Sequence, residues 1–168
     1  LMKRCHQNQT PFGVAWLRSG SEVQVPGQQP SMYPYGCLAH IREFEQLQPN
    51  FFRVVCQGGL RFELTSVAPG PLGVWQGQVT YLPQDAELEL PSHFQSHADR
   101  LGKVIASAQK QGVIDKLPIY PPYHLDQCGW VANHYAEAMD VEADIKQQLL
   151  SEPDPLKRLE AVAAIVEK

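Results

Sequence analysis

Residues 54–64 read VVCQGGLRFEL, two apolar runs on either side of the glycine pair Gly58-Gly59. Apolar side chains recur at every second position in both runs, which is the period of a β-strand. Glycines tolerate the positive φ angles of tight hairpin turns. A phosphate-binding loop would instead lead into a helix, and the chain after Gly59 continues with strand periodicity. The pattern therefore predicts a hairpin that turns at Gly58-Gly59, with a core that includes Val54, Cys56, Phe62 and Leu64.

Further strand patterns flank this hairpin on both sides. They lie in PFGVAWLRSG (11–20), GCLAHIREFEQL (36–47) and VWQGQVTYL (74–82). Residues 26–35, PGQQPSMYPY, contain three prolines and a glycine, which do not suit regular structure, so a loop is predicted there. Together these patterns predict an antiparallel, barrel-like sheet over residues 12–82.

The second half of the chain changes to helical periodicity. Apolar residues from Phe94 onward follow the spacing of an amphipathic helix, for which Gly112 is a plausible C-terminal stop. Two further helices are predicted around Trp130–Ala138 and Ile145–Leu149. Asp154 followed by Pro155 is a helix start signal, with the aspartate as N-cap. Strands followed by helices indicate an α+β fold.

Composition and charge limit the possible functions. The chain has 168 residues and a formal net charge of −4, with a net +2 in residues 1–80 and −6 in residues 81–168. Neither half contains the concentrated basic stripe that binding to a phosphate backbone requires, so nucleic acid is a poor candidate partner. The four cysteines form no CxxC pair and suit a reduced, cytoplasmic protein, and no apolar run predicts a membrane span.

Motifs for catalysis and metal binding are missing from the sequence. It contains no P-loop, dinucleotide-binding, zinc-protease or nucleophile-elbow motif. His93 and His97 have the spacing of two metal ligands on one helix turn, but a third ligand is not evident, and a solvated helix start is the competing interpretation. His134 falls on an apolar helix face, which favours a hydrogen-bonded core histidine over a catalytic base. These observations predict a protein without catalysis, cofactor or metal.

Aromatic side chains concentrate in two segments that are interrupted by proline and glycine. Met32, Tyr33 and Tyr35 lie in the predicted loop, and Trp75 follows the segment APGPLG. One interpretation is that they cover the ends of the barrel. The other is that they form a contact surface for extended or unfolded polypeptide, where adaptable methionine and rigid aromatic rings are both useful.

Three segments in order resemble the amino-terminal domain of the ATP-dependent protease Lon. Its Phe-Gly-Val strand corresponds to residues 12–14, and its Gly-x-x-Ala-x-Ile strand to Gly36, Ala39 and Ile41. Its Gly-x-x-Arg-Phe hairpin corresponds to Gly58 or Gly59 with Arg61-Phe62. In the tail, residues 143–162 are similar to its Lys-Gln-x-Leu-Leu-Glu and Asp-x-x-x-Arg-Leu segments.

This resemblance implies a PUA-like antiparallel β-barrel followed by a C-terminal helical part. The corresponding subdomains would be residues 1–90 and 91–168, with the first strands of the family's barrel missing before Leu1. The ATPase and protease modules of Lon have no counterpart here, so neither ATP hydrolysis nor proteolysis is expected. The implied role is binding of an unfolded or extended polypeptide or a protein partner, with Met32, Tyr33, Tyr35 and Trp75 as the predicted contact residues. A PUA-like RNA-binding module is the alternative.

Overall fold

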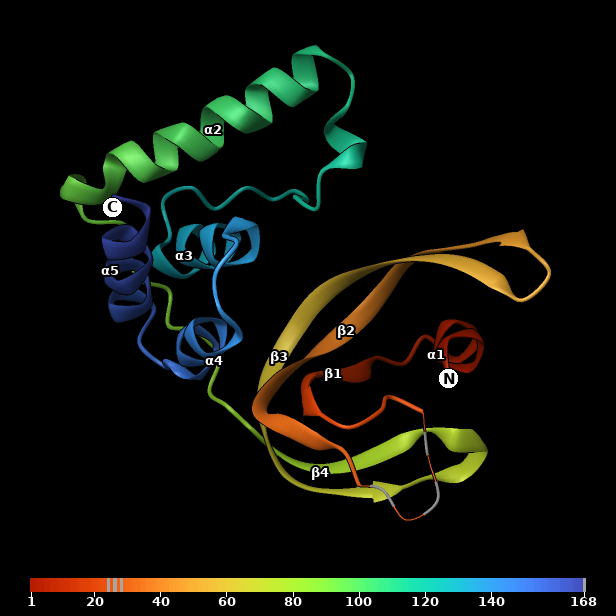
Figure 1. Ribbon diagram of the computed structural model, residues 1–168. Coiled ribbons are helices and arrows are strands. Elements are labelled where there is room, and N and C mark those ends of the chain that lie inside the picture. Colours follow the sequence, from red (N-terminus) through yellow and green to blue (C-terminus); the bar gives the residue numbers. More distant parts are fainter. Residues whose placement is uncertain (24, 26, 28, 168) are drawn as a thin grey trace. The chain divides into compact units, whose positions relative to one another are not determined.

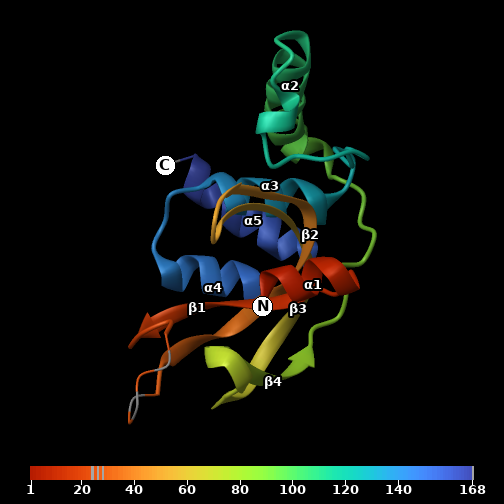
Figure 2. The same cartoon turned by 90° about the vertical axis from the view of Figure 1, so that its right-hand side faces the viewer.

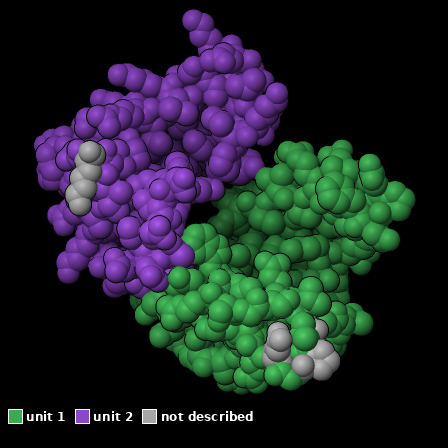
Figure 3. All heavy atoms as spheres, in the orientation of Figure 1, with its two compact units in different colours: residues 1–83 green, residues 84–168 purple. Residues whose placement is uncertain are grey.

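The computed structural model describes residues 1–167 apart from Gln24, Pro26 and Gln28 (Figure 1). The described chain divides into two compact units, residues 1–83 and 84–168, which are coloured separately in Figure 3. Unit 1 holds the strands and unit 2 holds the longer helices, in agreement with the α+β class expected from the sequence. None of the described helices is long and apolar enough to cross a membrane.

Unit 1 is built on an antiparallel sheet. Its elements are α1 (Met2–Asn8), β1 (Phe12–Ser19), β2 (Ser31–Gln48), β3 (Phe51–Pro69) and β4 (Trp75–Tyr81). The strands lie in the order β1-β2-β3-β4, and each pairs with its neighbour in the antiparallel sense. Within the described residues β1 and β4 are not paired with each other, so the expected closure into a barrel is not seen.

The turn predicted at Gly58-Gly59 is wrong, because both glycines lie inside β3. The chain reverses at Pro49-Asn50 instead, where Asn50 adopts φ 62° and Gln48 pairs with Phe51. The glycines mark a β-bulge, since Ala39 pairs with Gly58 but Cys37 pairs with Arg61, which leaves an extra residue on β3. A Cβ atom on Gly59 would lie 2.6 Å from His40 Nε2, so this glycine makes room for the neighbouring strand's side chain.

The predicted loop over residues 26–35 is only partly correct. Its residues Pro26 and Gln28 lie outside the described residues, and from Ser31 onward the segment belongs to β2. The strand tolerates Pro34 where the β1–β2 register is irregular, opposite the stretch from Ala15 to Leu17.

The core of unit 1 centres on Phe62, which is 3% exposed. Phe62 pairs with Gly36, and a Cβ on Gly36 would lie 2.6 Å from the Phe62 ring. A Cβ on Gly13 would lie 3.4 Å from the same ring. The ring therefore lies over two glycines on adjacent strands, which explains why the motifs on β1, β2 and β3 carry glycine or phenylalanine there.

The other residues predicted for the core of the hairpin differ in how far they are buried. Val54 and Leu64 are half-buried, whereas Cys56 is exposed. The prediction for Cys56 is wrong because the bulge at Gly58-Gly59 interrupts the continuous alternation on which it depended.

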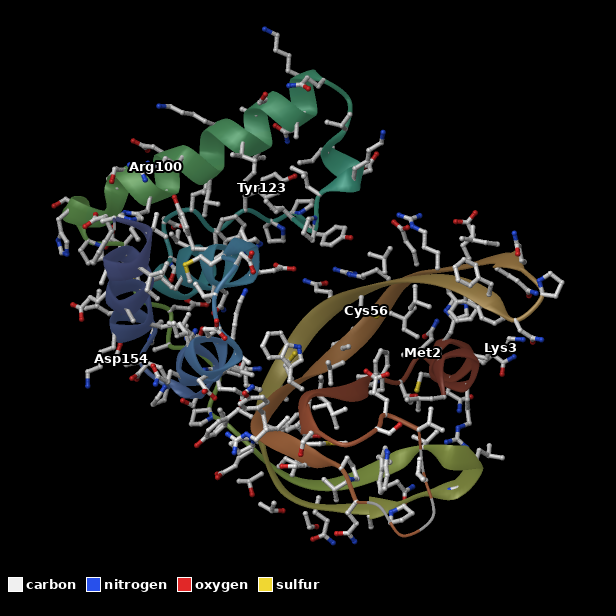
Figure 4. The ribbon with its side chains drawn as sticks, in the orientation of Figure 1. Met2, Lys3, Cys56, Arg100, Tyr123 and Asp154 are labelled. Carbon is white, nitrogen blue, oxygen red and sulfur yellow. The ribbon has the colours of Figure 1, made fainter. Side chains whose placement is uncertain are left out.

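Helix α1 packs against the far part of the β2–β3 hairpin (Figure 2). His6 stacks on Phe44 with ring centroids 4.7 Å apart, and Phe44 stacks in turn on Phe52 at 5.2 Å. Lys3, labelled in Figure 4, places its ammonium group 4.6 Å from the centre of the Phe52 ring. These contacts join α1 to the part of the hairpin near its turn, which lies away from Phe62 along the strands.

Unit 2 contains α2 (Gln95–Lys110), α3 (Cys128–Ala138), α4 (Ala143–Ser151) and α5 (Pro155–Val166). Gly112, at φ 67°, follows the end of α2 as predicted. The Asp154 side chain accepts hydrogen bonds from the backbone N–H groups of Leu156 and Lys157, which confirms the predicted N-cap. The core cluster contains Leu90, Phe94, Ala98, Cys128, Val131, Ala132, Leu159 and Ala163.

A buried arginine joins these helices. Arg158 is 1% exposed and donates to both carboxylate oxygens of Asp85, at 2.6 and 2.9 Å. Its other N–H groups donate to the carbonyl oxygens of Leu149 and Glu152 and to Asn133 Oδ1. All five donors of the guanidinium group therefore have partners, which is the condition for burying its charge.

Candidate functional site

The four residues predicted to contact polypeptide all lie in unit 1, and all are half-buried. Met32, Tyr33 and Tyr35 belong to the first part of β2 instead of a loop, and Trp75 is the first residue of β4. Met32 pairs with Leu17 across the sheet, and Tyr35 pairs with Glu63. Each residue therefore combines a fixed backbone with a side chain that is partly accessible to a ligand.

Tyr33 lies in a cluster with two residues of β1. Its ring meets the Trp16 ring edge-on, with centroids 6.5 Å apart and an interplanar angle of 62°. The Arg18 guanidinium carbon lies 4.6 Å from the centre of the Tyr33 ring, a cation–π distance. Trp16 remains 47% exposed despite this contact. We refer to Trp16, Arg18 and Tyr33 as the β1–β2 aromatic cluster.

Trp16 and Arg18 both lie in the strand predicted over residues 11–20, but neither was predicted as a contact residue. Their proximity to Tyr33 depends on the β1–β2 register, in which Ala15 pairs with Gly36 but Leu17 pairs with Met32. Between these two pairs β2 contains two more residues than β1, so Tyr33 does not lie where an unbroken register would place it. The available signal was the spacing of Trp16 and Arg18, which places both on one face of a strand.

Trp75 has a different neighbour. Its indole Nε1–H donates a hydrogen bond to the carbonyl oxygen of Glu22 at 3.1 Å, which ties the start of β4 to the connection between β1 and β2. Two strongly exposed apolar side chains lie in these connections, Leu72 at 89% and Val23 at 71%. Among the described residues, ring contacts do not join Trp75 to Tyr33, so the predicted set consists of the Tyr33 neighbourhood and the Trp75 neighbourhood.

His93 and His97, the two histidines considered as metal ligands, both lie against aromatic rings. His97 is buried between the rings of Phe94 and Tyr135, at 5.9 and 5.5 Å, so the interpretation as a solvated helix start is wrong for this residue. His93 is exposed and lies against Phe94. In the described part of the chain, histidine, cysteine and acidic side chains do not gather in a group of three or more that could hold a metal ion.

His134 and Cys128 carry side chains that can take part in catalysis, and both have structural surroundings. His134 is half-buried, and its Nδ1 lies 2.9 Å from the carbonyl oxygen of Trp130, in agreement with a hydrogen-bonded core histidine. The Cys128 thiol is buried, and its burial raises its pKa, which disfavours the reactive thiolate. The partly exposed aromatic residues of unit 1 therefore remain the candidates for a binding site.

The fold corresponds to a class of substrate-binding domain. The family described as "ATP-dependent protease La (LON) substrate-binding domain" matches residues 1–168, so the chain belongs to this family. The matching domain is the non-catalytic, substrate-binding part of such proteases, and a protease domain is not detected. The family confirms the resemblance noted in the sequence, and with it the PUA-like type of fold.

Solved structures show the same fold at low sequence identity. A crystal structure titled as a Lon N-terminal domain protein from Xanthomonas campestris aligns with a TM-score of 0.66 and 22% identity, over 97% of this chain and 80% of that one. The N-terminal domain of Mycobacterium avium complex Lon protease aligns with a TM-score of 0.50 and 18% identity, over 94% of this chain and 91% of that one. No curated protein sequence matches the chain significantly.

Proposed function

We propose that this chain is a non-catalytic binding protein that holds extended or unfolded segments of other polypeptides on unit 1. The observation that carries the proposal is the match of a substrate-binding domain family to the whole chain. The partly exposed residues of β2 and β4 supply a suitable surface, because aromatic rings and methionine bind varied side chains without demanding one sequence. The free cysteines are compatible with action in the cytoplasm.

The contact residues in this proposal are Met32, Tyr33, Tyr35 and Trp75. Tyr33 offers a ring already held by Trp16 and Arg18, so little side-chain entropy is lost when a ligand packs on it. Trp75 offers an indole fixed by its hydrogen bond to Glu22. A flexible ligand loses entropy when it is ordered, so we expect affinities in the micromolar range, about 8 kcal/mol of binding free energy.

The test is a binding titration of the whole chain with a permanently unfolded polypeptide, such as reduced and carboxymethylated lactalbumin. Tyr33→Ala combined with Trp75→Ala should weaken binding by about tenfold or more, as expected for central aromatic contacts. Tyr81→Ala is the matched control, because Tyr81 is an exposed aromatic residue of the same sheet that does not belong to the proposed contact residues. Trp75→Phe separates ring contact from the hydrogen bond, since it retains a ring but cannot donate to Glu22.

Two outcomes would contradict the proposal. One is equal affinity of the wild type and the double variant, with thermal unfolding of both unchanged. The other is a steep, salt-dependent affinity for RNA without affinity for unfolded polypeptide, which would favour the RNA-binding alternative.

A further inference from the structure

One face of β1 carries a row of exposed side chains. Val14, Trp16 and Arg18 are exposed at alternate positions, whereas Ala15 and Leu17 between them are half-buried. Alternate positions of a regular strand share one face, and the contacts of Trp16 and Arg18 with the Tyr33 ring bring these two side chains together although the β1–β2 register is irregular beside Leu17. We call Val14, Trp16 and Arg18 the β1 row.

Within the described residues, Arg18 of this row forms a ring contact but no ion pair. The Arg18 guanidinium group packs on the Tyr33 ring, and none of the carboxylates in the described residues forms an ion pair with it. A guanidinium group carries five N–H donors, and a cation–π contact leaves donors available for hydrogen bonds with a ligand. Arg18 is therefore held beside the Tyr33 ring while its N–H groups can donate to a carboxylate of a ligand.

The backbone of β1 is suited to the same ligand. Within the described sheet, β1 is an edge strand that pairs with β2 on one side. An edge strand presents N–H and C=O groups to which an extended chain can add as a further strand. In such an added strand, side chains on one face recur at alternate positions, with the same spacing as the β1 row.

We propose that the β1 row, together with Tyr33, selects extended segments in which an apolar and an acidic side chain lie two positions apart. The apolar side chain packs on Trp16, and the carboxylate pairs with Arg18. Charge complementarity favours this ligand, because the cation of Arg18 lies near the exposed indole of Trp16 and, among the described residues, pairs with no carboxylate. This inference rests on the proposed polypeptide binding and adds a preference for acidic segments to it.

The test uses a labelled peptide with phenylalanine and glutamate two positions apart in a serine and threonine background. The control peptide carries lysine in place of glutamate. With the whole chain, the glutamate peptide should bind more tightly, and the difference should shrink at high salt. Arg18→Gln should weaken binding of the glutamate peptide about threefold to tenfold and should not weaken binding of the lysine peptide, because a like-charge repulsion is removed. Arg42→Gln, which changes an exposed cation on β2, should leave both affinities unchanged.

A second variant tests the apolar part of the site. Trp16→Ala should weaken binding of both peptides, because the indole contact does not depend on the ligand's charge. Thermal unfolding of every variant establishes that the chain is folded.

Three results would overturn the inference. They are equal affinity for the two peptides, wild-type affinity of Arg18→Gln for the glutamate peptide, and wild-type affinity of Trp16→Ala for both. If unfolded lactalbumin still binds and the binding depends on Tyr33 and Trp75, these results remove the acidic preference and leave the proposed function intact. If the wild-type chain binds neither the peptides nor unfolded lactalbumin, both the acidic preference and the proposed function are wrong.

Discussion

Replacing Arg158 by alanine is predicted to destabilise unit 2 severely. The substitution removes all five hydrogen bonds of the guanidinium group and leaves the Asp85 carboxylate without its cation. It also leaves the carbonyl oxygens of Leu149 and Glu152 without these donors. Breaking a buried ion pair by removing one partner costs about 3–5 kcal/mol. With a urea m-value of about 2 kcal/mol/M, the unfolding midpoint should fall by about 2 M.

The assay is urea unfolding followed by Trp130 fluorescence, in a background where Trp16 and Trp75 are phenylalanine, so that the signal comes from unit 2. Lys157→Ala is the matched control, because Lys157 is the exposed neighbour of Arg158 on α5. Asp85→Asn should cost less than Arg158→Ala, because the arginine keeps its carbonyl partners.

A double-mutant cycle isolates the ion pair from its surroundings. The cycle uses Arg158→Met, Asp85→Asn and the double variant. The double variant should lose less free energy of unfolding than the sum of the losses in these two single variants, with a coupling energy of about 1–3 kcal/mol. If Arg158→Ala unfolds at the same urea concentration as Lys157→Ala, the hydrogen bonds of the arginine do not stabilise the packing of these helices.

Three further predictions concern single side chains. Phe62→Ala should lower the free energy of unfolding by about 3–5 kcal/mol, because the ring fills the space over Gly36; an unchanged denaturation midpoint would refute this placement. Asp154→Ala should cost about 1 kcal/mol through loss of the α5 cap, and Asp154→Asn much less; equal costs in thermal melts would refute the capping role. Burial raises the pKa of Tyr135 above its usual 10.0, so its contribution to stability is complete below that pH and falls as the pH rises through the folded pKa. Tyr135→Phe should therefore reduce the alkaline loss of stability in unfolding experiments at increasing pH, and an identical alkaline profile would contradict it.

Elements with a strong period were predictable from the sequence. The alternation in residues 12–18 and 36–47 and the helical spacing after Phe94 correspond to β1, β2 and α2, because burial of one face imposes those periods. The cap at Asp154 was predictable because its chemistry is local. Division into subdomains at residues 1–90 and 91–168 stays a prediction, which expression of the separate segments can test.

Features that depend on register or on distant pairs were not predictable. Gly58-Gly59 has the composition of a turn, but the reversal at Asn50 and the contact of Gly59 with His40 depend on how the strands pair. Asp85 and Arg158 are 73 positions apart, so no local pattern connects them. The cluster of Trp16 with Tyr33 likewise follows from an irregular register and not from spacing along the chain.

The central claim, that polypeptide binds on unit 1, is tested most directly by nuclear magnetic resonance. The isotope-labelled chain is titrated with unfolded, carboxymethylated lactalbumin, and shifts of the backbone amides and of the tryptophan indole N–H groups are followed. The account predicts progressive shifts at Met32, Tyr33, Tyr35 and the Trp75 indole, with the amides of α2 and α5 unaffected. Shifts confined to residues 84–168, or no shifts at saturating polypeptide, would contradict it.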